Sequence, residues 1–323
     1  MTARRAALAL ALATPAIARA QGAWRPDRPV RVVVPFAPGG ATDVVARALA
    51  ETVGAQLGQT IVIENRAGGA AGLIGSEAVA KSAPDGHTVL LHSNAHVIAP
   101  SLVSRMPFDV LGDFASVAHL GRVPQVLVVN NRLPITDMAS LLAWLRANSG
   151  KVDFASAGIG SGNHLASEIF RAAVPDVQME MVQFRGGGPA MAAVIAGNAH
   201  MCIDPLASAI GHIRGGSVRA IAVAGPTRAA VLPDVPSASE SGLAAWNAEA
   251  WFGAFVPVRT PASAQATLNA AFNAGMQRLA PRLSEMGVEV QPQYASQAAF
   301  DAFVRADLPR VAAVLRRAGV QPE

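Results

Sequence analysis

The chain has 323 residues, a formal net charge of +4 at pH 7, and only 5% aromatic residues. Basic residues are scattered singly, and one tyrosine with four tryptophans offers no base-stacking platform, so we do not expect nucleic-acid binding. Cys202 is the only cysteine, which excludes an internal disulfide and zinc sites built from several cysteines. A chain of this length exceeds the size at which one hydrophobic core stops growing, so we expect two lobes.

The first twenty residues have the pattern of a secretory signal peptide. Arg4 and Arg5 precede an apolar run over residues 6–18, and Ala18-Arg19-Ala20 has the small-x-small form of a cleavage site. A buried N-terminal helix is the alternative interpretation. The run is too short for a retained membrane span, and no later stretch reaches about 18 uninterrupted apolar residues. We therefore expect residues 1–20 to be removed on export to the periplasm.

Short β-branched runs then alternate with helical patterns, which predicts an α/β fold with mixed, mainly parallel sheets flanked by helices. Strands are expected at 30–34, 61–64, 89–91, 126–130, 152–155, 201–204 and 218–224. Helices are expected at 45–57, 70–81, 138–148, 164–173 and 189–196, and most of 261–317 is helical in pattern. Gly58 stands where the first helix needs a C-terminal cap.

Two segments have the composition of connections between lobes. They are Gly121-Arg122-Val123-Pro124 and the proline-punctuated run that begins at Leu232 and leads toward Trp251. If the chain crosses at both, lobe 1 comprises residues 24–124 and 247–323, and lobe 2 comprises residues 125–246. A ligand cleft is then expected between the lobes, because pockets favour domain interfaces.

A glycine-rich turn follows the first expected strand and leads into a helix. Gly39 and Gly40 allow backbone to approach a ligand closely, and the helix N-terminus presents unpaired N–H groups with partial positive charge. Thr42 or Asp43 is expected to cap this helix. A capped tight turn that binds nothing is the alternative.

Lobe 2 repeats the arrangement. After the strand at 152–155, Gly158, Gly160 and Ser161 would offer amides and a hydroxyl to an anion, with Asn163 as the expected N-cap. A third turn, residues 184–189, also opens a helix. Three or four hydrogen bonds to a charged group, at about 1.5–3 kcal/mol each, approach the roughly 8 kcal/mol of micromolar binding. Backbone amides can therefore bind a carboxylate without an arginine.

Motifs of the main enzyme classes are incomplete. The 158–163 segment lacks the sixth-position glycine of a dinucleotide site and the spacing of a nucleophile elbow, and no Walker-type Gly-Lys-Ser/Thr occurs. His92 and His96 are four residues apart, but no glutamate follows His92, so we expect no metal. We expect no cofactor and no enzymatic activity, although Ser161 with His164 leaves an exported hydrolase as an alternative.

The roles of single polar residues stay open at this point. His164 is equally suited to contact a ligand or to serve structurally. Asp204 ends a strand before Pro205, where it can accept a ligand amine or hydroxyl or cap the next helix. Cys202 is interpreted as a small core residue.

The order of motifs resembles the Bug/TctC-like receptors of tripartite tricarboxylate transporters. The resemblance covers nearly the whole chain after the signal and is carried by these stretches: VVVPFAPGGATD, IVIENRAGGAAG, SAPDGHTVLL, FASAGIGSGNHLASEIF, FRGGGPAMAAVIAG, RAIAVAGPTRAAVLPDVPSASESGL and WFGAFVPVRTP. It implies a type II periplasmic-binding-protein fold, a Venus flytrap whose two lobes close on a small organic acid. It also implies delivery to integral-membrane transporter subunits; a ligand-sensing adaptor for a membrane sensor kinase is the alternative. We expect a monomer.

In similar proteins the ligand carboxylate is held by the turn after the first strand and by the Ser-Ala-Gly-x-Gly-Ser turn. Two departures concern the far end of the ligand: Phe184 replaces a tyrosine, and His87 replaces the usual aromatic residue. The candidate ligand contacts in this chain are Phe36, Ala37, Pro38, Gly39, Gly40, Thr42, Asp43, Ala157, Gly158, Ile159, Gly160, Ser161, His164, Phe184, Gly187 and Asp204.

Overall fold

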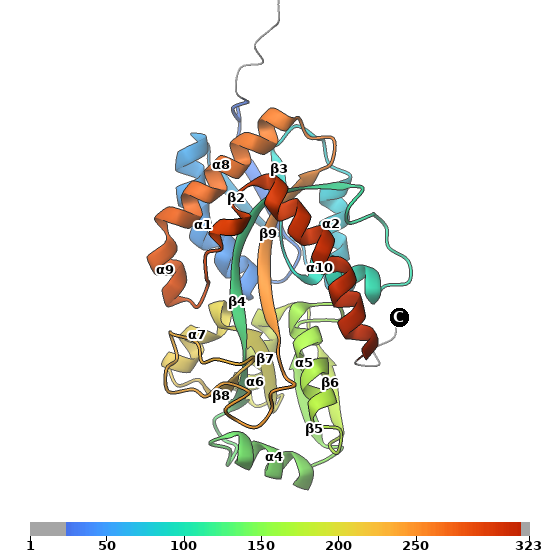
Figure 1. The fold of residues 1–323 in the computed structure, drawn as a ribbon, viewed down its shortest axis with the longest axis vertical. Coiled ribbons are helices and arrows are strands. Elements are labelled where there is room, and N and C mark those ends of the chain that lie inside the picture. Colours follow the sequence, from blue (N-terminus) through green and yellow to red (C-terminus); the bar gives the residue numbers. More distant parts are fainter. Residues whose placement is uncertain (1–23, 318–323) are drawn as a thin grey trace, which may run out of the picture.

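The computed structural model describes residues 24–317, so the expected signal peptide at 1–20 lies outside the described residues. Two α/β lobes lie one above the other (Figure 1). The upper lobe is built from both ends of the described chain. Its elements are β1 (Val30–Val34), α1 (Ala41–Leu57), β2 (Ile61–Asn65), η1 (Ala70–Gly72), α2 (Leu73–Ala80), β3 (Thr88–Ser93), α3 (Ala95–Ile98), η2 (Ala99–Ser101), α8 (Ala262–Arg278), α9 (Ala280–Glu285), η3 (Pro292–Tyr294) and α10 (Gln297–Arg317).

The lower lobe is a continuous segment of the chain. Its elements are α4 (Met138–Ala147), β5 (Val152–Ser156), α5 (Gly162–Ala173), β6 (Met179–Gln183), α6 (Gly187–Ala196), β7 (Met201–Pro205), α7 (Leu206–Arg214) and β8 (Val218–Val223). Two further strands, β4 (Phe114–Asn130) and β9 (Glu249–Pro257), complete the sheets, whose strand order through both lobes is β2-β1-β3-β9-β4-β7-β5-β6, with β8 paired to β4. Within residues 24–317, no helix is long and apolar enough to cross a bilayer.

Two strands, β4 (Phe114–Asn130) and β9 (Glu249–Pro257), run side by side from one lobe into the other (Figure 1). Residues 114–124 of β4 pair with β9, whereas residues 125–129 pair with β7 and 126–130 with β8. Because β4 changes partners between Pro124 and Gln125, we propose that the lobes comprise residues 24–124 with 247–317, and residues 125–246; residues 318–323 of the expected first lobe lie outside the described residues.

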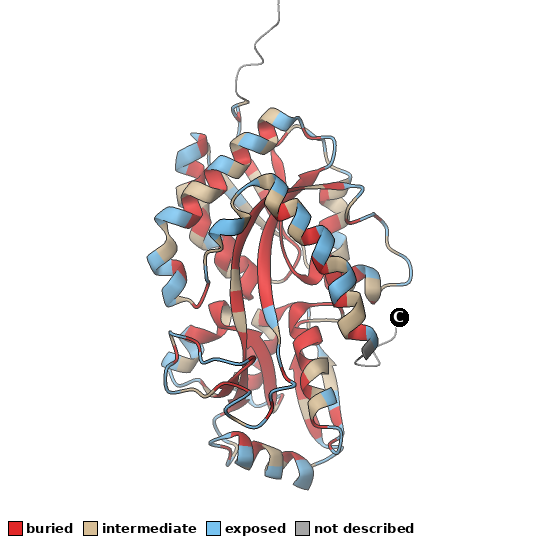
Figure 2. Ribbon diagram, in the orientation of Figure 1, coloured by how far each residue is buried: buried red, intermediate tan, exposed pale blue. Residues whose placement is uncertain are grey.

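Burial of one face explains the long helices. In α1, Val45, Leu49 and Val53 are almost fully buried against the sheet, as their four-residue spacing predicts. Gly58 ends the helix in the left-handed region, with φ 68°, and donates its N–H to the Gly54 carbonyl, so the predicted C-terminal cap is confirmed. Figure 2 shows the same division throughout, with buried strands inside and exposed outer helix faces.

The sheets differ from the expected pattern in two respects. Four of the eight strand pairings are antiparallel, because every pairing that involves β4 or β9 runs in that sense. The sequence patterns also did not predict β6, β9 or residues 114–125 of β4. The segment around Gly121 is therefore the interior of a long strand, at a register shift between His119 and Arg122, and not a loop.

Candidate functional site

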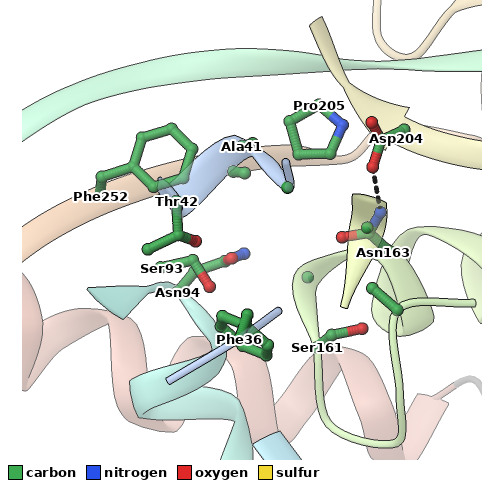
Figure 3. Close-up of a pocket in the computed structure, with 15 residues that line it drawn as sticks. Phe36, Ala41, Thr42, Ser93, Asn94, Ser161, Asn163, Asp204, Pro205 and Phe252 are labelled. Atoms are coloured by element: carbon green, nitrogen blue, oxygen red, sulfur yellow. Dashed lines mark hydrogen bonds between the residues drawn. The ribbon is translucent and has the colours of Figure 1, made fainter. Parts of the chain in front are cut away.

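A small cavity lies between the lobes, where the carboxyl ends of β1, β3, β5 and β7 face β9 (Figure 3). It is lined by Phe36, Gly40, Ala41, Thr42, Ser93, Asn94, Ala157, Ser161, Gly162, Asn163, Gly187, Asp204, Pro205, Ala250 and Phe252. The space open to the centre of a water-sized sphere is about 30 Å³, enough for one or two water molecules. Because this space is too small for an organic ligand, we infer that the lobes are closed here and move apart to admit one.

Four helices begin at this cavity. Gly40 and Thr42 lie at the start of α1, Gly162 at the start of α5, Gly187 at the start of α6, and Pro205 directly before α7. Each helix N-terminus carries unpaired N–H groups and the equivalent of roughly +0.5 elementary charge. None of the fifteen lining residues is a lysine, arginine or histidine. Positive potential at this cavity therefore comes from backbone dipoles.

The side chain of Asp43 stabilises the first glycine-rich turn through hydrogen bonds. Its carboxylate accepts hydrogen bonds from the Gly39 N–H at 3.0 Å, from Arg47 Nε at 2.9 Å and from Asn65 Nδ2 at 3.0 Å. Burial alone would raise the pKa of Asp43, but these hydrogen bonds outweigh it and lower the pKa. The expected side-chain cap by Thr42 or Asp43 is wrong: Gly40 is the N-cap residue, and no side chain caps α1.

Ser161 is the N-cap of α5, and this replaces the expected cap by Asn163. The Ser161 hydroxyl oxygen accepts from the His164 backbone N–H at 3.0 Å, which leaves the hydroxyl hydrogen to donate into the cavity. The imidazole Nδ1 of His164 accepts from the Gly160 N–H at 3.4 Å, so it braces the same turn.

Asn163 and Asp204 are joined on the lower-lobe wall of the cavity. Asn163 Nδ2 donates to Asp204 Oδ1 at 2.6 Å and to the Ile203 carbonyl at 3.0 Å (Figure 3). The Ser208 hydroxyl donates to Asp204 Oδ2. Burial raises the pKa of Asp204 to about 6, although these two hydrogen bonds act in the opposite direction.

The third glycine-rich turn contacts the first one across the cleft. The Ala37 N–H donates to the Arg185 carbonyl at 3.0 Å, and a Cβ added to Gly188 would lie 2.3 Å from the Pro38 carbonyl oxygen. A Cβ on Gly40 would likewise lie 3.3 Å from the Gly187 nitrogen. The glycines that the sequence suggested for close approach to a ligand thus also let the two lobes approach each other.

A second contact between the lobes lies at η1. The Ala71 N–H donates to the Ile159 carbonyl at 2.6 Å, and Ala71 has a φ of 52°, unusual for a residue other than glycine. His92 supports Ala71, because its Nε2 lies 3.1 Å from the Ala71 carbonyl while its Nδ1 accepts from the Ser93 N–H. Burial, followed by repulsion from His96, holds the pKa of His92 well below its usual value. In the neutral tautomer of His92 both ring nitrogens have a hydrogen-bond partner. Among the described residues, no three or more His, Cys, Asp or Glu side chains lie together so that they could hold a metal ion.

Seven of the sixteen candidate contacts line the cavity: Phe36, Gly40, Thr42, Ala157, Ser161, Gly187 and Asp204. Nine others lie in the surrounding turns and do not line it: Ala37, Pro38, Gly39, Asp43, Gly158, Ile159, Gly160, His164 and Phe184. Phe184 lines a separate hollow with Gly158 and Pro35. His87, the other departure noted above, packs against Trp24, with ring centroids 5.4 Å apart.

Eight lining residues were missed: Ala41, Ser93, Asn94, Gly162, Asn163, Pro205, Ala250 and Phe252. Ser93 ends β3 and Asn94 follows it, so the rule that ligands sit at the carboxyl ends of strands would have found them. Ala250 and Phe252 carry no local signal, because β9 reaches the cavity only through its pairing with β3 and β4.

Comparisons with known proteins agree with this architecture. BugT of Bordetella pertussis is 36% identical over 324 residues, which is 99% of each chain. The solved structure of the periplasmic binding protein BugD superposes with a TM-score of 0.88 at 32% identity, covering 92% of this chain and 100% of that one. MatC from Rhodopseudomonas palustris with bound malate superposes with a TM-score of 0.84 at 33% identity, covering 90% and 99%.

These relatives are solute-binding proteins and not enzymes, and the same holds for this chain. The family model described as "Tripartite tricarboxylate transporter family receptor" matches residues 45–320. That match, together with the two lobes joined by β4 and β9 and the cavity between them, shows that the chain belongs to the tripartite tricarboxylate transporter receptor family, the Bug/TctC proteins.

Proposed function

We propose that this protein is a periplasmic receptor that captures a small organic carboxylate between its lobes and delivers it to the membrane subunits of a tripartite tricarboxylate transporter. The observation that carries the proposal is the convergence of the N-termini of α1, α5, α6 and α7 on one interlobe cavity without a basic side chain. Such an arrangement binds an anion through backbone N–H groups.

The charge balance at the cavity favours an anion in spite of Asp204. Four helix N-termini supply the equivalent of roughly +2 elementary charges, whereas Asp204 is the only acidic residue among the lining residues. The Ser161 hydroxyl adds a donor. When the lobes close, water leaves the N–H groups at the N-termini of α1 and α5. A carboxylate of the ligand then accepts hydrogen bonds from these N–H groups in place of the water.

The cavity also limits ligand size. The closed form has room for only one or two waters, and its walls contain Phe36, Phe252 and small residues. A short mono- or dicarboxylate displaces these waters with a modest separation of the lobes. The similar MatC was solved with malate, a short dicarboxylate that is larger than one or two waters, so a ligand of this kind requires the lobes to separate or rearrange.

Thermal unfolding with a panel of short mono-, di- and tricarboxylates tests the binding proposal. A ligand present at 100 times its Kd stabilises the folded protein by about 2.7 kcal/mol, so a true ligand raises the Tm by several degrees. If no carboxylate changes the Tm of a cooperatively unfolding protein, the proposal is wrong.

Gly187→Ala locates the site. The new Cβ would lie 2.8 Å from Asp204 Oδ1 inside the cavity, and Gly187 has no positive φ to forbid alanine. The ligand identified above should bind at least about tenfold more weakly to Gly187→Ala, because the Cβ occupies cavity space beside Asp204 and a loss of about 1.4 kcal/mol of ligand contact is a factor of ten in Kd. Gly211→Ala is the matched control, since a Cβ on this α7 glycine meets nothing within 4 Å. Equal affinities in the two variants would remove the start of α6 from the site.

Delivery to a transporter is tested in the cell. Deleting the gene should abolish uptake of the identified carboxylate, and restoring the gene should rescue it. Uptake that continues unchanged while transcription of the uptake genes loses its response to the carboxylate would instead favour a sensor role.

A further inference from the structure

The amide of Asn163 has only one orientation that its neighbours accept. Its Nδ2 lies 3.0 Å from the Ile203 carbonyl oxygen and 2.6 Å from Asp204 Oδ1, and both partners are acceptors. A flipped amide would set Oδ1 against these two oxygens, so the hydrogen bonds fix the assignment. Figure 3 shows the amide oxygen on the side away from Asp204, facing the cavity. Asn163 is buried, so this oxygen has little water to accept from.

Asp204 adds acceptors to the same wall. Its side chain is 1% exposed and lines the cavity, and an ionised carboxylate accepts hydrogen bonds without donating any. Asp204 Oδ1 lies 2.8 Å from the position that a Cβ on Gly187 would take, so only a glycine at the start of α6 lets the backbone approach this oxygen so closely. The lower-lobe wall thus presents acceptors beside the donor-rich helix N-termini.

We propose that the ligand carries a hydrogen-bond donor besides its carboxylate, a hydroxyl or an ammonium group, and that Asn163 Oδ1 and Asp204 select for this donor. The inference rests on the proposed function, since it concerns the ligand of the same cavity. The carboxylate meets the α1 and α5 N-termini, and the donor meets the acceptor wall. The oxygens of Asp204 already accept from Asn163 and Ser208, so a ligand without a donor leaves the Asn163 oxygen as the acceptor without a partner in the closed cavity. Sites built to pair a hydroxyl reject analogues that lack it.

Matched ligand pairs test the selection by titration calorimetry at pH 8, where a second carboxyl of the ligand is ionised and donates nothing. The pairs are malate and succinate, aspartate and succinate, and lactate and propionate. The donor-bearing member of at least one pair should bind about tenfold or more tightly than its partner. Equal affinity within every pair, or tighter binding of the donor-free member, overturns this inference but leaves carboxylate binding intact. No binding by any compound overturns the proposed function and the inference with it.

Two variants assign the effect to the wall. Asn163→Leu has similar shape but no acceptor, so the affinity ratio within the discriminating pair should fall toward one; Asn198→Leu, an exposed control, should keep the wild-type ratio. Asp204→Asn retains an oxygen for the Asn163 amide while removing the charge, so it should weaken an ammonium ligand about tenfold more than a hydroxyl ligand. Because each readout is a ratio of affinities in one variant, a loss of stability does not imitate it. Unchanged ratios in both variants show that the Asn163–Asp204 pair only ties α5 to β7.

Discussion

Replacing Gly188 by alanine should hold the two lobes apart without touching the cavity. Gly188 lies in the first turn of α6 and has no positive φ, so alanine fits its backbone and suits the helix better by up to about 1 kcal/mol. In the closed form, however, the new Cβ would lie 2.3 Å from the Pro38 carbonyl oxygen and 3.2 Å from the Gly39 carbonyl carbon. The variant should therefore fold normally and close poorly.

The size of the effect follows from the contacts between the lobes. Relieving a 2.3 Å contact requires a separation of about 1 Å, which stretches the Ala37 N–H to Arg185 carbonyl bond from 3.0 Å beyond hydrogen-bond range. The Ala71 to Ile159 bond spans the same interface. Losing two such bonds at about 0.5–1.5 kcal/mol each disfavours closure by about 1–3 kcal/mol, or about 5–150-fold.

Amide hydrogen exchange measures this effect without a ligand. Exchange at Ala37 and Ala71 should be faster in Gly188→Ala than in wild type by the same 5–150-fold, and the radius of gyration in solution scattering should increase. The Gly211→Ala control should change neither quantity. Wild-type exchange rates at both amides in a stable Gly188→Ala protein would refute the interpretation of the two turns as a closing contact.

Three further outcomes can be checked by equilibrium unfolding. Because burial raises the pKa of Asp204 to about 6, the folded state binds this proton more tightly than the unfolded state, and the resulting stability is present below about pH 4 and lost as the pH rises through 6. Over this range the free energy of unfolding of wild type should fall by up to about 3 kcal/mol relative to that of Asp204→Asn. Parallel pH profiles of the two proteins would contradict the raised pKa. Ala71→Gly should be about 1 kcal/mol more favourable than Ala70→Gly, since only Ala71 has a left-handed backbone; equal costs would show that Ala71 is not strained. Ser161→Ala should cost about 1 kcal/mol through loss of the N-cap of α5, whereas exposed Ser239→Ala should be neutral.

Local patterns were sufficient for the elements whose signals lie within one stretch of chain. The strand at 30–34, the helix that Gly58 ends and the turn before α5 each combine hydrophobic spacing with a glycine or a cap, and the structure contains all three. β6 was missed because it is short and only one of its five residues is buried, so its apolar pattern is weak. β9 is a continuous apolar run that fits a strand or a helix equally well without its partners.

The candidate site likewise contains residues that local sequence patterns predict and residues that they do not. The turns that begin α1 and α5 could be predicted because glycines, a strand before and a helix after them are visible in the sequence. The turn that begins α6 shows only its glycines and the helix after it, since β6 was not predicted. Phe252 reaches the cavity only through tertiary contacts of β9, such as the Asn94 N–H to Trp251 carbonyl bond at 2.9 Å, which joins the end of β3 to β9. The meeting of Gly188 with Pro38 is likewise a property of the closed lobes, and neither turn indicates it alone.

The paired strands that join the lobes restrict how the protein can move. Two strands hydrogen-bonded along the crossing from Phe114 to Pro124 form a ribbon, which resists shear between its strands more than bending across them. We therefore expect the lobes to open and shut by bending of this ribbon near the register shift at Gly121, so that the glycine turns meet in the same alignment at each closure. One distance between a point on each lobe is then enough to describe how far the molecule is open. A pair of fluorophores at two such points would therefore report ligand binding through a single energy-transfer signal.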